Sequence, residues 1–308
     1  MPNSIKLKQQ KAALLAGDKP PRAREAAKQL NISEAEYVAL SCGESTYLLD
    51  KNSLTTIFLE LHRIGEVMAL TRNDAVVLEH HGIYNNPVIK EDHIVISETD
   101  MDLRLQISDW QYGFAVDEGG RQSFQFFDMY GQAVHKIYMT KNSNLQVYDD
   151  LASQFTVDGG FEHMSVKQKV PQPKVDRPLG NSAIPLQAQA LQPLFEKAVE
   201  DNWSLLMHVP NGSATQIHNG SVHKLLTMGP WFNVLDPKFN MHASLQLINE
   251  AWLVVKKTNG ESAVSLELFD ANDNAVMMMY LQPSSSTPEI IKQWEDFLIT
   301  QKVEGITV

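Results

Sequence analysis

The side chains most able to do chemistry in this chain of 308 residues are its ten histidines. An imidazole nitrogen binds transition metals and exchanges protons near neutral pH. His80 and His81 precede Gly82 between two β-rich stretches, where we expect a turn with solvated side chains. His135 belongs to a strand-like stretch, and a position on a sheet face is favoured for it over metal binding. His163 stands in a segment without periodicity and is a further candidate metal ligand.

Other residues able to carry chemistry are few. Cys42 is the only cysteine, so no intramolecular disulfide can form, and a core position is favoured over a nucleophile. Arg104 alternates with Leu103 and Leu105, so its guanidinium points away from apolar neighbours; an exposed arginine paired with Asp102 and a ligand-binding residue both fit. The patterns G-x-G-x-x-G, G-x-x-x-x-G-K-[ST], H-E-x-x-H, C-x-x-C and G-x-S-x-G do not occur.

The elements that must position these residues come in two copies. "SFQFFDMYGQAVHKIY" (123–138) and "SLELFDANDNAVMMMY" (265–280) match without a gap at one offset of 142 residues. "TRNDAVVLEHHG" (71–82) matches "VPNGSATQIHNG" (209–220) at an offset of 138 residues, which pairs His80 with His218. A period near 140 residues is too long for a solenoid, so it indicates duplication of a whole sheet-containing unit.

Each copy combines helices with many short β-rich stretches. Helical patterns cover residues 5–40, with a capping box at Ser33 and Glu36, and residues 54–67, 143–157, 186–202 and 288–301. The glycines of "DEGGR" (117–121) predict a β-hairpin turn. We therefore expect an α+β fold, an internally duplicated unit of helices plus a large antiparallel β-sheet. The two repeats would form a pseudo-twofold molecule with a cleft between them, a frequent place for a ligand.

The predicted boundaries follow the repeats. An N-terminal repeat covers residues 1–156 and a C-terminal repeat covers residues 186–308. Between them, residues 157–185 are rich in Pro, Gly and Lys, which is typical of a linker.

Composition excludes several classes of protein. A net charge of -11 without a basic stripe argues against nucleic-acid binding, which requires clustered Lys and Arg. No run approaches the 18 or so consecutive apolar residues of a membrane span, so the protein is not expected to be membrane-embedded. The N-terminus lacks the apolar region of a secretory signal, and one cysteine suits a reducing compartment, so a cytoplasmic location is expected.

Several motifs together resemble one known family. They are "RAREAAKQLNISEAEYVALSCGE" (22–44), "MDLRLQISDWQYGFAV" (101–116), "GPWFNVLDPKFNMH" (229–242), "NEAWLVVKK" (249–257) and the repeated segment described above. The chain closely resembles the HemS/ChuS family of cytoplasmic haem-trafficking and haemin-degrading factors. The resemblance implies haem of the b type as cofactor, in a pocket between the halves.

The resemblance also implies binding residues. Arg104 in "MDLRL" matches the family arginine on the distal side of haem, and Lys256 and Tyr280 match contacts near the propionates. Two family arginines are replaced by Val255 and Pro283. The inter-repeat segment is shorter than in the family, and the helix that begins with the axial histidine is missing. His163 in the linker is therefore the first candidate for the haem iron, with His80 and His81 as further candidates.

Two functions fit these observations. The first is a cytoplasmic haem-binding protein of haem and iron acquisition, with an inner-membrane haem importer or a haem-accepting protein as partner. It would carry haem and, given an external reductant, could assist its degradation in the manner of a haem oxygenase; whether it is an enzyme is left open. Arg104 and the intact repeats favour this function.

The second is a non-enzymatic homologue that has lost haem binding. It would use the cleft between the repeats for another ligand or for a protein partner. Val255, Pro283 and the short linker favour this alternative.

Overall fold

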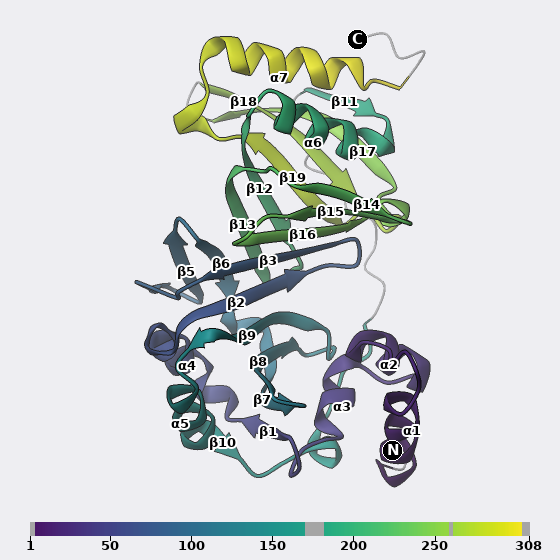
Figure 1. The fold of residues 1–308 in the computed structure, drawn as a ribbon, viewed down its shortest axis with the longest axis vertical. Coiled ribbons are helices and arrows are strands. Elements are labelled where there is room, and N and C mark those ends of the chain that lie inside the picture. The colour runs from purple at the N-terminus through teal and green to yellow at the C-terminus, as the bar shows by residue number, and fades with distance from the viewer. Residues whose placement is uncertain (1–3, 170–181, 259–260, 304–308) are drawn as a thin grey trace. The chain divides into compact units, whose positions relative to one another are not determined.

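The computed structural model describes residues 4–169, 182–258 and 261–303 (Figure 1). The helices are α1 (Ser4–Leu15), α2 (Ala23–Leu30), α3 (Glu34–Ala39), α4 (Leu54–Glu60), α5 (Leu145–Phe155), α6 (Leu191–Glu200) and α7 (Pro288–Thr300). The first ten strands are β1 (Thr46–Leu49), β2 (Gly65–Arg72), β3 (Val76–Gly82), β4 (Val88–Lys90), β5 (His93–Glu98), β6 (Met101–Gln106), β7 (Trp110–Glu118), β8 (Arg121–Asp128), β9 (Ala133–Ser143) and β10 (Thr156–Val157). The others are β11 (Ser182–Leu186), β12 (Ser204–Pro210), β13 (Ala214–Ser221), β14 (Leu225–Met228), β15 (Trp231–Leu235), β16 (Phe239–Ser244), β17 (Glu250–Thr258), β18 (Glu261–Phe269) and β19 (Ala275–Leu281).

Most of these strands pair antiparallel in two large sheets, which confirms the expected α+β fold. The chain divides into two compact units, each made from separate stretches of sequence. Unit 1 contains Met1–Leu70, His81–Ser97 and Arg104–Pro171, and unit 2 contains Thr71–His80, Glu98–Leu103 and Gln172–Val308. Two short stretches of the N-terminal repeat therefore belong to unit 2. None of the described helices is both long enough and apolar enough to cross a membrane.

In unit 1 the strand order is β10-β1-β7-β8-β9-β2. Gly119 and Gly120 at the β7–β8 turn have φ of 64° and 80°, a backbone conformation that glycine adopts without strain, so the predicted hairpin is confirmed. The capping box of Ser33 and Glu36 at the start of α3 is also confirmed. Deep in this unit, Tyr84 and His135 share a 2.6 Å hydrogen bond inside an aromatic cluster.

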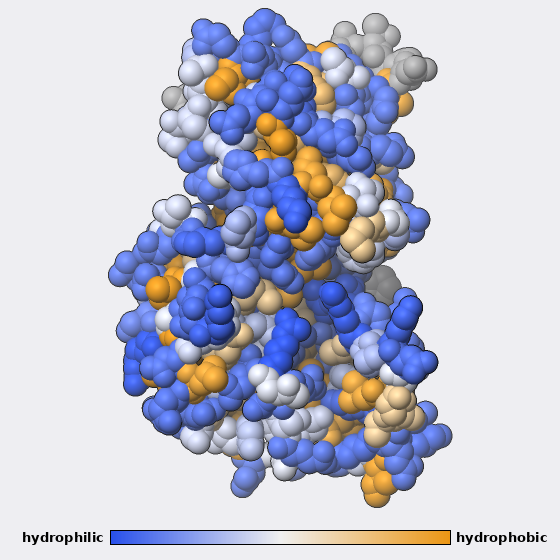
Figure 2. Space-filling model, in the orientation of Figure 1, coloured by the Kyte–Doolittle hydropathy of each residue, from blue (hydrophilic) through white to orange (hydrophobic). Residues whose placement is uncertain are grey.

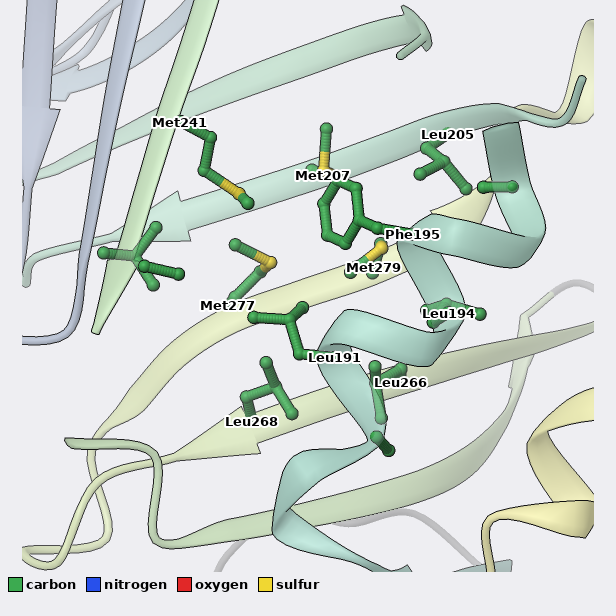
Figure 3. Packing of buried hydrophobic residues seen from close by; sticks show 14 of the residues in the cluster. Leu191, Leu194, Phe195, Leu205, Met207, Met241, Leu266, Leu268, Met277 and Met279 are labelled. Carbon is green, nitrogen blue, oxygen red and sulfur yellow. The ribbon is translucent and has the colours of Figure 1, made fainter. Parts of the chain in front are cut away.

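In unit 2 the strand order is β11-β17-β18-β19-β12-β13, and a second group runs β3-β16-β15-β14. One apolar core joins both groups to α6 and α7. Figure 3 shows Leu191, Leu194 and Phe195 of α6 in the same core as Leu266 of β18 and Met279 of β19. Because residues alternate between the two faces of a strand, this core fixes which side chains lie on the opposite face of the sheet.

The face of the molecule in Figure 2 is mostly hydrophilic, with apolar patches between the hydrophilic residues. In unit 2 the apolar side chains on the surface include Leu226 and Met228 of β14 and Trp231 of β15, with exposed fractions of 41%, 63% and 39%. Strand β14 is also the last strand of its group, so one of its edges has no neighbouring strand in that group.

The duplication extends to structural detail. A bulge interrupts the β8–β9 pairing between Phe126 and Phe127, and the equivalent bulge interrupts β18–β19 between Leu268 and Phe269. The following turns are also equivalent, because Asp128 and Asp270 each accept two backbone N–H groups through Oδ1, from residues two and four positions ahead. The repeated unit inferred from the sequence is therefore a repeated structure.

One expectation was wrong, and another stays a prediction. His80 and His81 lie in strand β3 and not in a turn, because the alternation of buried and half-buried residues from Val76 to Gly82 continues through both of them. The predicted linker at 157–185 contains a short 3₁₀ turn, Phe161–His163, and most of strand β11. Residues 170–181 of the linker lie outside the described residues, and the boundaries of the repeats stay a prediction.

Candidate functional site

Unit 2 presents one sheet face that combines polar, aromatic and apolar side chains. It lies on strands β12, β17, β18 and β19, opposite the face that packs on α6 and α7. We call it the Lys256 face, and its residues are Leu206, His208, Trp252, Val254, Lys256, Ser265, Glu267, Met278 and Tyr280. Val254, Ser265 and Glu267 are buried, and the other six side chains are half-buried.

Strand register places four of these residues in one line. Trp252 pairs with Glu267, Glu267 pairs with Met278, and Met278 pairs with His208. Neighbouring strands lie about 4.8 Å apart, so this line extends for about 14 Å across four strands. The sheet therefore brings together side chains that are up to 70 positions apart in the sequence, from His208 to Met278.

Tyr280 and His208 are neighbours on this face. Their ring centroids are 5.8 Å apart with an interplanar angle of 58°. Tyr280 pairs with Leu206 across β19 and β12, which places an apolar side chain beside the phenol. A phenol, an imidazole and an apolar group thus lie together on the two adjacent strands.

Lys256 forms an ion pair on the same face. Its Nζ lies 2.5 Å from Oε1 of Glu267, whose side chain is only 5% exposed. Ser265 Oγ donates to the same carboxylate oxygen at 3.2 Å. A buried carboxylate requires such partners, because leaving it unpaired would be costly. The Lys256 ammonium carries three N–H donors, so the pair with Glu267 leaves it able to bind a second anion.

Comparison with known proteins shows which family has this architecture. Residues 31–155 and 174–299 match the model of the haemin-degrading HemS/ChuX domain. The chain belongs to the HemS family. The two matched segments correspond to the two repeats, which supports the internal duplication.

Individual relatives cover nearly the whole chain. The hemin transport proteins HmuS of Yersinia pestis and HemS of Yersinia enterocolitica are each 27% identical over 315 residues, covering 89% of this chain and 91% of the relative. The apo structure of PhuS, a heme-binding protein from Pseudomonas aeruginosa, superimposes with a TM-score of 0.87 at 25% identity, covering 98% of this chain and 100% of PhuS. The heme degrading enzyme ChuS of Escherichia coli O157:H7 gives the same TM-score, identity and coverage.

Two of the HemS-family contacts expected from the sequence lie on the Lys256 face. Lys256 and Tyr280 are on strands β17 and β19, with β18 between them. Val255, at a position where the resemblance implies an arginine, packs against the core on the other side of β17. Pro283 begins a 3₁₀ turn, Pro283–Ser285, directly after β19. Neither of these replacements supplies a positive charge.

The candidates Arg104, His163 and His81 belong to unit 1 and not to the Lys256 face. Arg104 is half-buried on β6, and its Nη1 donates to the carbonyl oxygen of Ile96 at 3.1 Å. Leu103 and Leu105 on either side of it are fully buried, as the alternation predicted. His163 ends the 3₁₀ turn Phe161–His163 and is exposed, and His81 is half-buried on β3.

His80 is buried in unit 2, in a different place from the Lys256 face. Its Nδ1 accepts a hydrogen bond from Gln216 Nε2 at 2.7 Å, so its proton is on Nε2, which faces His218 Nδ1 at 3.3 Å. Phe239 stacks on His218 with ring centroids 3.7 Å apart. Burial lowers the pKa of His218 to about 4. Both nitrogens of His80 are engaged, so metal binding there would require one of these contacts to break.

His208 is the residue of this face that sequence reasoning missed. The signal was present in "SLLMHV" (204–209), where His208 alternates with the buried Met207 and Val209. What the sequence could not provide was the pairing of β12 with β19, which joins strands about 70 residues apart and brings His208 beside Tyr280.

Proposed function

We propose that this protein binds haem and carries it in a pathway of haem and iron acquisition, with the Lys256 face of unit 2 as a principal contact surface. One observation carries the proposal. Lys256 and Tyr280, the two residues matched to propionate contacts, lie on one face of one sheet in a chain that belongs to the HemS family.

The residues present fit the chemistry of haem. A haem site combines an apolar surface for the macrocycle with cations or hydrogen-bond donors for two propionates and a ligand for iron. Lys256 offers an ammonium and Tyr280 a phenolic hydroxyl. Trp252, Leu206 and Met278 offer half-buried apolar surface between and beside them. Arg104 stays a proposed contact to the distal side of haem.

The proposal includes a cellular context. The protein would work in the cytoplasm, take haem from an inner-membrane importer and pass it to an accepting protein. Degradation of the macrocycle would require an external reductant, and the protein's contribution would be to orient the ligand and control access to it. Carriage of haem does not depend on that second activity.

A second function is favoured by a specific observation. The ammonium of Lys256 is already paired with Glu267 at 2.5 Å, and Val255 and Pro283 remove two further positive charges. A homologue that has lost haem would keep this fold and use the same face for another ligand or for a protein partner.

Titration of the purified protein with haemin, followed through the Soret band, distinguishes the two functions. Serum albumin serves as a competitor, because haemin also associates weakly with many apolar surfaces. A saturable shift at a one-to-one ratio that persists against albumin supports haem carriage. A shallow response without saturation, removed by albumin, supports the second function.

A further inference from the structure

We propose that a cavity in unit 1 binds a small polyanion, that is, a molecule with two or more phosphate or carboxylate groups. The cavity lies between α2, the start of α3, the β8–β9 turn and residues 166–168, and its volume is about 620 Å³. Its lining residues all belong to unit 1, whereas the Lys256 face belongs to unit 2. The inference therefore goes beyond the proposed function and does not require haem binding.

Three cationic side chains line this cavity. Arg24 and Lys28 are one helical turn apart on α2, so both project from the same face of that helix. Lys167 comes from a segment that is anchored at the β8–β9 turn, because its backbone N–H donates to the carbonyl oxygen of Met129 at 2.9 Å. Among the residues that the structure describes, the exposed ammonium groups of Lys28 and Lys167 have no hydrogen-bond or ion-pair partner. Both are thus available to a ligand.

The two carboxylates that line the cavity are already engaged. Oε1 of Glu34 lies 2.7 Å from Lys136 Nζ in a buried ion pair. Oε2 of Glu36 accepts hydrogen bonds from the backbone N–H and the hydroxyl of Ser33, each at 2.8 Å. With Lys136 counted, four cations stand against two carboxylates here, in a chain whose net charge is -11. This local excess of positive charge favours an anion as the ligand.

The remaining lining suits a molecule of modest size. The side-chain amides of Asn31, Gln132 and Gln168 can donate hydrogen bonds to anionic oxygens. The half-buried side chains of Tyr130 and Ile32 add a phenol and some apolar surface. A volume of about 620 Å³ falls within the range of roughly 300–1,000 Å³ that small-molecule sites occupy.

The placement of the available cations favours a ligand with more than one anionic group. Lys28 and Lys167 are 139 positions apart in the sequence, and the fold brings both to one cavity. A ligand with a single charge engages one ammonium at a time. A ligand with two or more anionic groups can bind both at once, and its second contact then forms at a high effective concentration.

Calorimetric titration of the full chain with pyrophosphate and with citrate tests the inference. The variant combines Lys28→Gln with Lys167→Gln. Its matched control combines Lys90→Gln with Lys141→Gln, at exposed positions that do not line the cavity. Each double variant removes two positive charges, so a diffuse attraction to the whole protein would weaken equally in both.

We expect wild type and the control to bind at least one of the two probes saturably at a one-to-one ratio. The dissociation constant of that probe should rise at least about tenfold in the Lys28 and Lys167 variant. Binding of pyrophosphate alone identifies a phosphate ligand, and binding of citrate alone identifies a carboxylate ligand. If the double variant does not fold by circular dichroism, Gln132→Glu replaces it, because this exposed substitution adds a carboxylate to the cavity and should also weaken binding.

Two results would overturn the inference: no saturable binding of either probe by wild type, or an equal loss of affinity in both double variants. Haemin titration of the same proteins separates the inference from the proposed function. Haemin affinity should be the same in wild type and in the Lys28 and Lys167 variant. A loss of haemin affinity in that variant alone would assign the cavity to haem and overturn a separate polyanion site, while leaving haem binding itself intact.

Discussion

Asn73 and Asn211, which are equivalent positions of the two repeats, make reciprocal hydrogen bonds. Nδ2 of Asn73 donates to the carbonyl oxygen of Pro210 at 3.0 Å, and Nδ2 of Asn211 donates to that of Arg72 at 3.1 Å. Each side chain thus binds the residue that precedes the other. Each Oδ1 also accepts a backbone N–H two and three positions ahead in its own turn. The duplicated turns therefore stabilise each other within unit 2.

Replacing either asparagine by alanine should destabilise the protein. Asn73→Ala loses the cross-repeat hydrogen bonds to the carbonyl oxygens of Pro210 and Val276, and Asn211→Ala loses the one to Arg72. Each also loses the acceptor of its own turn, for a cost of about 1–3 kcal/mol per substitution. Because the two side chains share one network, the double variant should lose less than the two single losses added together. Urea denaturation measures this, with the exposed Asn85→Ala as control. Strict additivity would show that the two turns are independent.

Gly131 occupies a position that no other residue should fit. Its φ is +67°, and an added Cβ would overlap Ser33 Oγ and lie 2.5 Å from Ser33 Cβ. Gly131→Ala should therefore be destabilised in two ways, by the strain of a positive φ for alanine and by displacement of Ser33, the N-cap of α3. The total cost should be roughly 2–3 kcal/mol. Gly119→Ala is the matched control, because it has φ of +64° with nothing within 4 Å of the added Cβ and should cost only about 1 kcal/mol. Equal thermal destabilisation of the two variants would contradict the clash with Ser33.

The ion pair of Lys136 with Glu34 is buried, with 7% and 6% of the side chains exposed and 2.7 Å between Nζ and Oε1. Lys136→Met should cost about 3–5 kcal/mol, since it removes the buried ammonium that lies 2.7 Å from the carboxylate of Glu34. Combining it with Glu34→Gln should recover much of that loss. Chemical denaturation of the single and double variants tests this, and a double variant no more stable than Lys136→Met would refute the explanation.

Buried histidines should make the protein less stable in acid. Burial lowers the pKa of His218 to about 4 and that of His135 to about 3, from the ordinary value of 6.5. The unfolded chain therefore takes up protons first as the pH falls below about 6.5. Stability should be complete above that pH and decline toward pH 4, by up to about 1.4 kcal/mol per pH unit for each of the two groups.

Substitution separates the contribution of one group. The glutamine of His218→Gln cannot titrate. The free energy of unfolding should therefore fall less steeply between pH 6 and pH 5 than in wild type, by about 1.4 kcal/mol per pH unit, the effect of one proton. Asn85→Gln, an exposed substitution that removes no titratable group, should leave the slope unchanged. Urea midpoints measured at several pH values give both slopes. An unaltered slope in His218→Gln would mean that this imidazole does not titrate differently on folding.

Local signals in the sequence were sufficient for much of the fold. The capping box at Ser33 and the glycine pair at the β7–β8 turn are determined by residues a few positions apart, so both were predictable. The repeat was equally visible, because duplication preserved the residues around Phe127 and Phe269. His80 was wrongly assigned to a turn, because the polar residues Glu79 and His81 beside it do not look like part of a strand. In the structure, buried and half-buried residues alternate from Val76 to Gly82.

The candidate site depends on contacts that no local pattern contains. The ion pair of Lys256 with Glu267 requires the register of β17 with β18, and the proximity of His208 to Tyr280 requires the pairing of β12 with β19. Resemblance to a family supplied Lys256 and Tyr280, because their motifs persist. It could not supply His208, which belongs to no family motif that the sequence displays.

The most direct test of the central claim is haemin affinity in a variant of the Lys256 face. Lys256→Met combined with Tyr280→Phe removes the ammonium and the hydroxyl at nearly constant volume. The control combines Lys224→Met with Tyr47→Phe, both at exposed positions on none of the four strands that form this face. Haem carriage through the Lys256 face predicts a dissociation constant at least about tenfold higher in the first variant and unchanged in the control. Equal haemin affinities in wild type and both variants would contradict it.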